Sequence, residues 1–283
     1  MYIMQEYDEA LRHIIKNGVR RSNRTNIDTI SVFGYQARYS ISEHFPILTK
    51  RKMFYKSIFK ELLWILSGST NVNELESMGS KIWSAWRDKG FENSNGYDDG
   101  DLGPIYGWQL RHFGGDYKDK KSGFDQLKYV ANELKNNKFS RRILFTYWNA
   151  PDVTSNRVKL PPCHHTFQLY VDNNDRLSGM LYQRSADYPI GVPANIQFYS
   201  ALIYMLAQQC GNQFTPHELI HSTGDSHIYL NQVDAVEEYL NREKTNSPKL
   251  ILNKAKDIFS YSINDFEVIN YNPQGKIKIP VEV

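Results

Sequence analysis

The chain has 283 residues, of which 41% are hydrophobic and 23% charged, values typical of a globular protein and not of a disordered one. Its net charge of +3, from 34 basic and 31 acidic residues, is too small to indicate a nucleic-acid-binding protein. No apolar run approaches the ~20 residues of a membrane span, and the N-terminal segment is unlike a signal peptide, so a cytoplasmic protein is expected.

The first hundred residues predict two helices and a strand. Apolar residues at helical spacing indicate an amphipathic helix over residues 2–17, and a polar, basic loop over 20–25 follows it. The next segment, 29–41, favours a strand. A strongly apolar helix is predicted over 53–66, whereas residues 87–101 are rich in Gly, Asn and Asp and are predicted to form a surface loop.

The rest of the chain mixes helices and strands irregularly. The predicted helices cover residues 124–137, 195–210 and 228–241. The predicted strands cover residues 142–148, 164–171 and 177–183, and short strand-like runs follow from 248. This order favours one α+β domain over residues 1–283 and argues against a doubly wound nucleotide fold. Neither of the common Gly-rich phosphate loops occurs in the sequence.

Two cysteines occur, Cys163 and Cys210, and their different contexts indicate neither a disulfide framework nor a zinc site. Cys163 follows two prolines and precedes His164 at the start of a predicted strand. A thiolate is a strong nucleophile, so Cys163 is a candidate catalytic residue, with a structural cysteine as the alternative. His164 is not expected to pair with it directly, because adjacent strand residues point to opposite faces.

Four arginines lie near the ends of predicted elements: Arg24, Arg141, Arg142 and Arg184, the last beside Ser185. Guanidinium groups and a hydroxyl suit a phosphate dianion. For any one of these arginines, the alternative is a solvated surface side chain. The four together indicate an anionic ligand more strongly than any one of them alone.

Four further polar residues are candidates for a ligand site or for acid–base catalysis. Asn195 follows a polar segment at the predicted start of an apolar helix, where it either caps the helix or reads the edge of a base. His227 and Tyr229 are two residues apart and share a face if extended. Glu61 lies inside the apolar helix, where burial would raise its pKa and suit it to acid–base catalysis.

The chain resembles the folate-dependent thymidylate synthase family from about residue 5 to the C-terminus. The resemblance rests on blocks that occur in the family's order, KELLW, LGPIYGWQLRHFG, SRRI, LPPCHHTFQLYV, LYQRSADYPIGVPAN and GDSHIYLNQ. It implies a single α+β domain with a layered β-sheet and flanking helices, working as a symmetric homodimer.

The resemblance implies specific roles. Cys163 would add to C6 of dUMP, Glu61 would act as the acid or base near the pyrimidine carbonyl, Tyr106 would assist proton removal, and Asn195 would read the uracil edge. Arginines near the sulfur would help to keep it ionised. The implied dUMP ligands are Arg24, Arg141, Arg142, His164, Gln183, Arg184, Ser185, Asp187, Asn195, His227 and Tyr229.

Within that set, Arg141 and Arg142 would come from the partner subunit. On the folate side, Asp187 would lie near the pterin, Trp83 would pack beside the cofactor, and the C-terminal Val283 would close over the ligands. No metal and no nucleic acid is expected. The implied reaction is methylation of dUMP to dTMP with 5,10-methylenetetrahydrofolate, which gives dihydrofolate.

Three positions depart from the family's usual pattern: Ser84 replaces an acid, Ala194 an aromatic, and Glu282 a small residue. The runner-up is therefore a dUMP hydroxymethylase, in which water rather than hydride captures the exocyclic methylene. A dCMP substrate is disfavoured, because family members that act on dCMP tend to carry Asp at the position of Asn195. A non-catalytic binding protein and a cysteine hydrolase are further alternatives that fit the residues less well.

Overall fold

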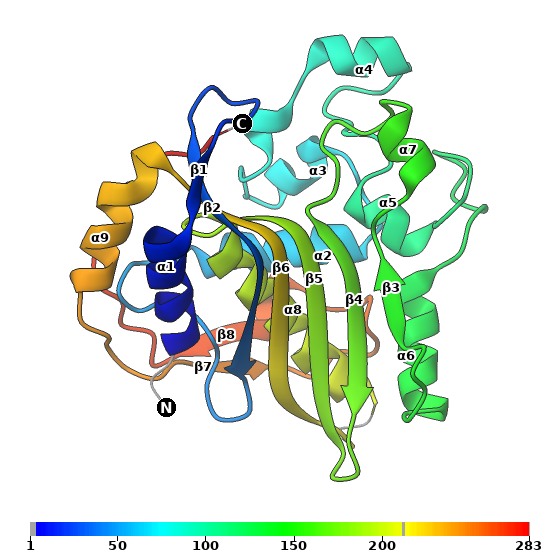
Figure 1. The fold of residues 1–283 in the computed structure, drawn as a ribbon. Helices are drawn as coiled ribbons and strands as arrows, with labels where there is room; N and C mark the ends of the chain where they lie inside the picture. Colours follow the sequence, from blue (N-terminus) through cyan, green and yellow to red (C-terminus); the bar gives the residue numbers. More distant parts are fainter. Residues whose placement is uncertain (1–3, 211–212, 283) are drawn as a thin grey trace.

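The computed structural model describes residues 4–210 and 213–282, and its centre is a six-stranded sheet in the order β1-β2-β6-β5-β4-β3 (Figure 1). The strands are β1 (Val19–Arg21), β2 (Thr29–Ser40), β3 (Leu144–Thr146), β4 (His164–Val171), β5 (Arg176–Asp187) and β6 (Thr215–Tyr229). Neighbouring strands run antiparallel except β5 and β6, which are parallel. A separate ribbon pairs β7 (Lys249–Leu252) with β8 (Phe266–Ile269).

Helices cover one face of the sheet. The α-helices of the described chain are α1 (Gln5–Asn17), α2 (Tyr55–Leu66), α3 (Val72–Ser77), α4 (Lys89–Asn95), α5 (Tyr106–Arg111), α6 (Gln126–Asn136), α7 (Ala150–Thr154), α8 (Gly191–Gln209) and α9 (Val233–Asn241). Of these, α1, α5, α6 and α8 contact strands of the sheet directly. The long α8 joins β5 to the parallel β6, and Figure 1 shows α8 and α2 behind the sheet. Because α8 lies between the sheet and α2, it is apolar nearly all round.

The opposite face of the sheet is open over β3, β4 and β5. The register pairs Thr166 with Tyr182 and Gln168 with Met180, so these side chains share one face, and Phe167 and Leu181 share the other. Phe167 and Leu181 are buried, whereas Tyr182 and Met180 are about 40% exposed. The sheet therefore has one face packed by helices and one open face that still carries large apolar side chains.

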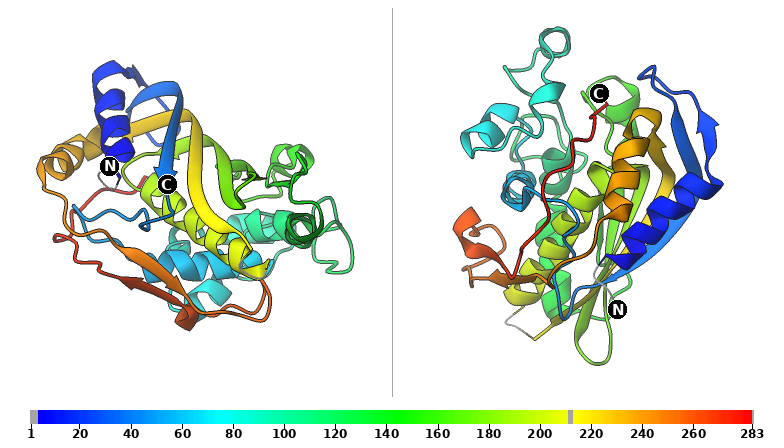
Figure 2. Two further views of the ribbon diagram at one scale, coloured as in Figure 1. Left: turned by 90° about the horizontal axis from the view of Figure 1, so that it is seen from below. Right: turned by 90° about the vertical axis from the view of Figure 1, so that its left-hand side faces the viewer.

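The C-terminal segment lies against the residues just before α9. Figures 1 and 2 place its last described residues near α9 and the loop that joins β1 to β2. Two hydrogen bonds hold it there: Gln232 Nε2 donates to the carbonyl of Pro280 over 2.9 Å, and Asn231 Nδ2 donates to Glu282 Oε1 over 2.7 Å.

The predicted layered α+β architecture is confirmed. The helices predicted over 53–66 and 124–137 correspond to α2 and α6, and the strand predicted over 164–171 is β4. The helix predicted over 2–17 is α1, although residues 2 and 3 lie outside the described part of the chain. Several shorter elements differ from the prediction.

Two segments predicted as loops contain regular structure. In the segment 20–25, Arg20 and Arg21 belong to β1, which pairs with β2. The segment predicted as a loop over 87–101 contains α4, because the carboxylate of Asp88 accepts hydrogen bonds from the backbone N–H groups of Gly90 and Phe91 and so caps a helix.

Three boundaries near the site were also wrong. The strand predicted to end at residue 183 continues to Asp187, because β5 keeps pairing with β6. The helix predicted from residue 195 begins at Gly191, so Asn195 lies inside α8 and is not its cap. The helix predicted from residue 228 begins at Val233, because β6 continues to Tyr229.

Candidate active site

A cavity of about 720 Å³ lies where α2, α8, β5, β6 and the C-terminal segment meet. Its volume is typical of small-molecule sites. Most of the residues expected from the sequence line it: Arg24, Glu61, Trp83, Tyr106, Cys163, His164, Gln183, Ser185, Asp187, Asn195, His227 and Tyr229. The fold therefore brings into one cavity side chains that are up to about 200 residues apart in the chain.

Cys163 stands just before β4, in a loop that is held from both sides. Its backbone N–H donates to Tyr106 Oη over 2.8 Å, and its carbonyl accepts the backbone N–H of Arg184 over 2.9 Å. The guanidinium of Arg184 donates to the carbonyls of Pro161 and Pro162 over 2.7 and 2.8 Å. The thiol position is thus fixed by main-chain and side-chain bonds rather than by a neighbouring histidine.

Burial raises the pKa of the Cys163 thiol above its ordinary value, whereas the charges of Arg184 and Arg24 lower it and that of Asp187 raises it. The arginines act in the expected direction, but burial is the larger effect. The arginines therefore help as expected, but they do not by themselves keep the sulfur ionised in the free site. The thiol is mostly protonated at neutral pH and has to lose its proton during the reaction.

Two ionisable groups beside Cys163 have strongly shifted pKa values. Burial raises the pKa of Glu61 to about 7, although the indole N–H of Trp83 donates to its Oε1 over 2.5 Å. Burial lowers the pKa of His164 to about 4, so its ring is neutral at pH 7, with Nδ1 3.0 Å from Tyr199 Oη. Glu61 is thus suited to move protons near neutral pH, and His164 to hydrogen bonding.

A chain of hydrogen bonds fixes the amide of Asn195 in the cavity. Asn195 Nδ2 donates to Gln183 Oε1 over 3.0 Å, and the same oxygen lies 2.9 Å from His221 Nε2. Burial lowers the pKa of His221 to about 3, so this ring is neutral and Nε2 carries the proton that it donates. Gln183 Nε2 in turn donates to the carbonyl of Ser185 over 2.9 Å. The amide orientation is therefore set by the protein before any ligand binds.

At the other end of the cavity stand groups suited to a phosphorylated sugar. The cation of Arg24, in the loop between β1 and β2, and the hydroxyl of Ser185 face the same space as His227 and Tyr229. The rings of His227 and Tyr229 lie 5.3 Å apart, centroid to centroid, at 88° to each other. The strand alternation predicted from their spacing is confirmed, because both belong to β6.

The comparisons with known proteins agree with this geometry, since the thymidylate synthase family model matches residues 5–283. The chain belongs to the thymidylate synthase family. It is 44% identical to the human thymidylate synthase, over 98% of this chain and 90% of the human one. It is 41% identical to the enzyme of Malacoplasma penetrans, over 99% and 100%. It is 42% identical to that of Equine herpesvirus 2, over 98% of each chain.

These matches identify an enzyme of one-carbon transfer, a methyltransferase. All three relatives are named thymidylate synthase, and none favours the hydroxymethylase alternative. The readings as a non-catalytic binding protein and as a cysteine hydrolase are set aside by the same matches.

The three departures from the usual family pattern lie in different places. Ala194 lines the cavity. Glu282 also lines it and accepts a hydrogen bond from Asn231 Nδ2, whereas Ser84 is not a lining residue and donates to Glu76 Oε1 over 2.5 Å. Of the three changes, only Ala194 puts a smaller side chain in the cavity wall than the family usually has.

Not all of the expected residues line this cavity. Arg141 and Arg142 are exposed ahead of β3. Arg184 is not among the lining residues either, and its guanidinium binds the carbonyls of Pro161 and Pro162 and lies over the ring of Trp148. Val283 lies outside the described residues.

Sequence reasoning missed Arg51. It lines the cavity, and its guanidinium donates to the carbonyl of Pro189 over 2.6 Å. The available signal was the basic run Lys50-Arg51-Lys52 directly before an apolar helix. Trp86 also lines the cavity and packs 5.3 Å from Trp83, centroid to centroid.

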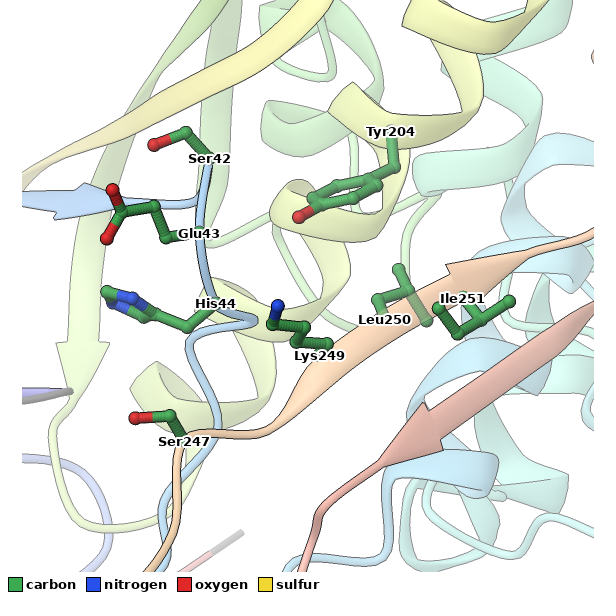
Figure 3. A pocket seen from close by; sticks show the side chains of 8 residues that line it. All are labelled: Ser42, Glu43, His44, Tyr204, Ser247, Lys249, Leu250 and Ile251. Carbon is green, nitrogen blue, oxygen red and sulfur yellow. The ribbon is translucent and has the colours of Figure 1, made fainter.

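A second hollow, of about 630 Å³, lies between the loop after β2, α8 and β7 (Figure 3). Glu43, His44, Tyr204 and Lys249 are among its lining residues. None of the residues expected to be functional lines it, so it is separate from the family's site. In the described part of the chain, no group of three or more Cys, His, Asp and Glu side chains is arranged to hold a metal ion, and no helix could span a membrane.

Proposed function

We propose that this chain catalyses the reductive methylation of dUMP to dTMP with 5,10-methylenetetrahydrofolate, giving dihydrofolate. The observation that carries the proposal is the position of Cys163. Its thiol opens into the same cavity as the fixed amide of Asn195 and the cation of Arg24. A nucleophile, a base-reading group and an anion-binding group are what covalent catalysis on a pyrimidine nucleotide requires.

The nucleotide would lie along β5 and β6. Arg24 and Ser185 would bind the phosphate, with His227 and Tyr229 at the ribose. Asn195 would then face the uracil edge, where its carbonyl accepts from N3–H and its amide donates to O4.

The first chemical step follows from this placement. Cys163 Sγ bonds to C6 of the pyrimidine, and the electron pair of the C5–C6 bond moves towards the C4 carbonyl oxygen. C5 becomes nucleophilic, and Asn195 and Glu61 stabilise the charge on oxygen. The thiol proton, which burial retains in the free site, passes to a neighbouring acceptor as the bond forms.

The later steps need proton transfer and release of the sulfur. Tyr106, whose hydroxyl already binds the backbone of Cys163, would assist removal of the C5 proton. Glu61, with its pKa of about 7, would exchange protons with the pyrimidine carbonyl. When the Cys163 Sγ–C6 bond breaks, its electron pair leaves with the sulfur as a thiolate. The electrons of the C4–C5 enolate restore the C5–C6 double bond, and the methylated base is freed.

The folate would bind on the apolar side of the same cavity. Ile82, Trp83 and Trp86 offer an apolar, largely aromatic surface there, and the Asp187 carboxyl offers a partner for ring N–H groups. Methylenetetrahydrofolate would supply the one-carbon unit and the hydride that reduces it. Residues of the C-terminal segment, with Val283 at its end, would limit the access of water to that hydride.

We also propose a homodimer formed by the open face of the sheet. Tyr170 is 66% exposed there, and Leu144, Met180 and Tyr182 are each about 40% exposed. These residues share one face by register, and large apolar patches on soluble proteins commonly mark interfaces. Arg141 lies at the edge of this face, since its carbonyl accepts from Gln168 Nε2 over 3.3 Å. From that edge Arg141 and Arg142 would reach the phosphate site of a second copy.

Product analysis tests the proposed function. The protein is incubated with dUMP and methylenetetrahydrofolate, and the nucleotide product is identified by mass while dihydrofolate is followed by absorbance. We expect dTMP and an equal amount of dihydrofolate. Formation of 5-hydroxymethyl-dUMP without dihydrofolate, or no change in dUMP, would overturn the proposal.

A further inference from the structure

His227 is held by a carboxylate that does not itself line the cavity. Its Nδ1 lies 3.1 Å from Asp225 Oδ1, two residues earlier on the same face of β6. The pKa of Asp225 is held below its ordinary value by His227 and by the hydrogen bond from Ser31, so the carboxylate carries no proton to donate. The hydrogen in this contact therefore lies on Nδ1 of His227.

Both oxygens of Asp225 are engaged by groups from other strands. Ser31 Oγ, on β2, donates to Oδ1 over 2.8 Å, and Arg21, on β1, donates to Oδ2 over 2.7 Å. Ser31 pairs directly with His227 in the register of β2 and β6. The carboxylate is thus fixed by three strands, and it cannot rotate away from the imidazole without losing these bonds.

The other ring nitrogen is left for the ligand. His227 lines the cavity, is 8% exposed, and has no hydrogen bond from Nε2 to any other described residue. When Nδ1 carries the one ring proton, Nε2 is an acceptor. It therefore matches a ligand group that donates a hydrogen bond.

We propose that Asp225 is a positioning residue that fixes the Nδ1–H tautomer of His227, so that Nε2 accepts a hydrogen bond from the 3′-hydroxyl of the nucleotide. This rests on the proposed function, which places the ribose beside His227 and Tyr229. In dUMP the 3′-hydroxyl is the only free hydroxyl of the sugar, so the pair selects nucleotides that retain it. A carboxylate that fixes a histidine tautomer in this way acts through the histidine and touches no substrate.

The test compares dUMP with 2′,3′-dideoxyuridine monophosphate, which lacks only the 3′-hydroxyl. We expect the wild-type enzyme to prefer dUMP in kcat/KM. Asp225→Asn offers an amide that donates as readily as it accepts, so either tautomer of His227 becomes allowed. Its kcat/KM for dUMP should fall about tenfold or more, and for the dideoxy analogue less than about threefold, because no hydrogen bond is lost there.

Controls separate this role from a structural one. Asp28→Asn removes the carboxylate of the Arg20–Asp28 ion pair, whose N···O distance is 2.6 Å, at the hairpin of β1 and β2. It should leave kcat/KM for dUMP and for the dideoxy analogue near the wild-type values. The ratio of the two rates does not depend on the folded fraction. Should Asp225→Asn not fold, Ser31→Ala removes one bond to the same carboxylate and should lower the preference for dUMP about threefold.

The outcomes are distinct. An equal fall on both substrates, or a wild-type enzyme that does not distinguish them, would overturn the role of Asp225. A wild-type enzyme that is inactive on dUMP as well would instead overturn the proposed function.

Discussion

The indole N–H of Trp83 donates to Oε1 of Glu61 over 2.5 Å, and the two side chains meet on the wall of the cavity that contains Cys163. The bond favours the ionised carboxyl, yet burial is the larger effect and raises the pKa of Glu61 to about 7. A carboxyl with this pKa holds and releases protons at neutral pH, as a general acid or base must. It also makes the stability of the protein depend on pH in a definite direction.

Glu61→Gln should change the pH dependence of stability. The folded carboxyl keeps its proton up to about pH 7, whereas the unfolded one loses it near the ordinary pKa of 4.5. The free energy of unfolding of the wild type is therefore undiminished by this group below pH 4.5, and it falls as the pH rises from 4.5 to about 7. The glutamine cannot titrate. Urea unfolding at pH 5 and pH 8 should show the variant gaining up to about 3 kcal/mol relative to wild type. An unchanged difference between the two pH values would contradict the raised pKa.

Arg184→Gln should slow alkylation of Cys163 by iodoacetamide at pH 8. Burial already raises the pKa of this thiol, and Arg184 is the largest influence that lowers it. Without that charge the thiolate fraction should fall roughly three- to tenfold. The measurement uses a Cys210→Ser background, so that Cys163 is the only thiol.

Arg184→Lys is the matched control for that measurement. It keeps the charge but cannot reproduce both bonds to the carbonyls of Pro161 and Pro162. A rate near wild type for the lysine variant would assign the effect to charge. Equal slowing in both variants would show instead that Arg184 acts by anchoring the loop.

Arg142→Ala and Cys163→Ser should complement each other. Each homodimer alone should be inactive, because one lacks the phosphate ligand expected from the partner and the other lacks the nucleophile. A mixed dimer has one site with both residues intact, so subunit exchange should restore up to about a quarter of the wild-type sites at equal mixing. No recovery despite exchange shown by mass would place Arg142 outside the partner's site.

Asn195→Asp should weaken the discrimination against dCMP. Cytosine presents an acceptor at N3 and a donor at C4, the reverse of uracil, and a protonated carboxyl can match it. A mispaired polar group at a buried edge costs about 1–3 kcal/mol, so the dUMP-to-dCMP ratio of kcat/KM should shift at least about tenfold. Asn71→Asp, which retains the N-cap of α3 away from the cavity, should leave the ratio unchanged. An unchanged ratio in a folded Asn195→Asp variant would remove Asn195 as the base reader.

The sequence predicted the residues around Cys163 well because each lies in a short block with its own chemistry. Cys163, Gln183 and Asn195 stand in such blocks, and the sheet brings them together. It did not predict β6, because His, Ser, Thr and Gly along residues 215–229 hide the alternation of a strand that is paired on both sides. It also missed Arg51, since only the folded chain places that side chain beside the cavity.

The directions in which side chains point could likewise not be predicted from the sequence. The pattern left open whether Asn195 caps a helix, and only the start of α8 at Gly191 decides against it. That Arg184 binds a phosphate stays a prediction, whereas the bonds from its guanidinium to the carbonyls of Pro161 and Pro162 could not be predicted from the sequence. Such distinctions depend on strand register, which a shift of one residue would reverse.

The central claim is that Cys163 is the nucleophile on the pyrimidine ring. The most direct measurement is incubation with 5-fluoro-dUMP and methylenetetrahydrofolate, followed by intact-protein and peptide mass spectrometry. Fluorine at C5 cannot be removed as a proton is, so the reaction should stop at a covalent complex of protein, nucleotide and folate, with the nucleotide on Cys163. Its absence from Cys163, or an adduct that persists in Cys163→Ser, would contradict the account.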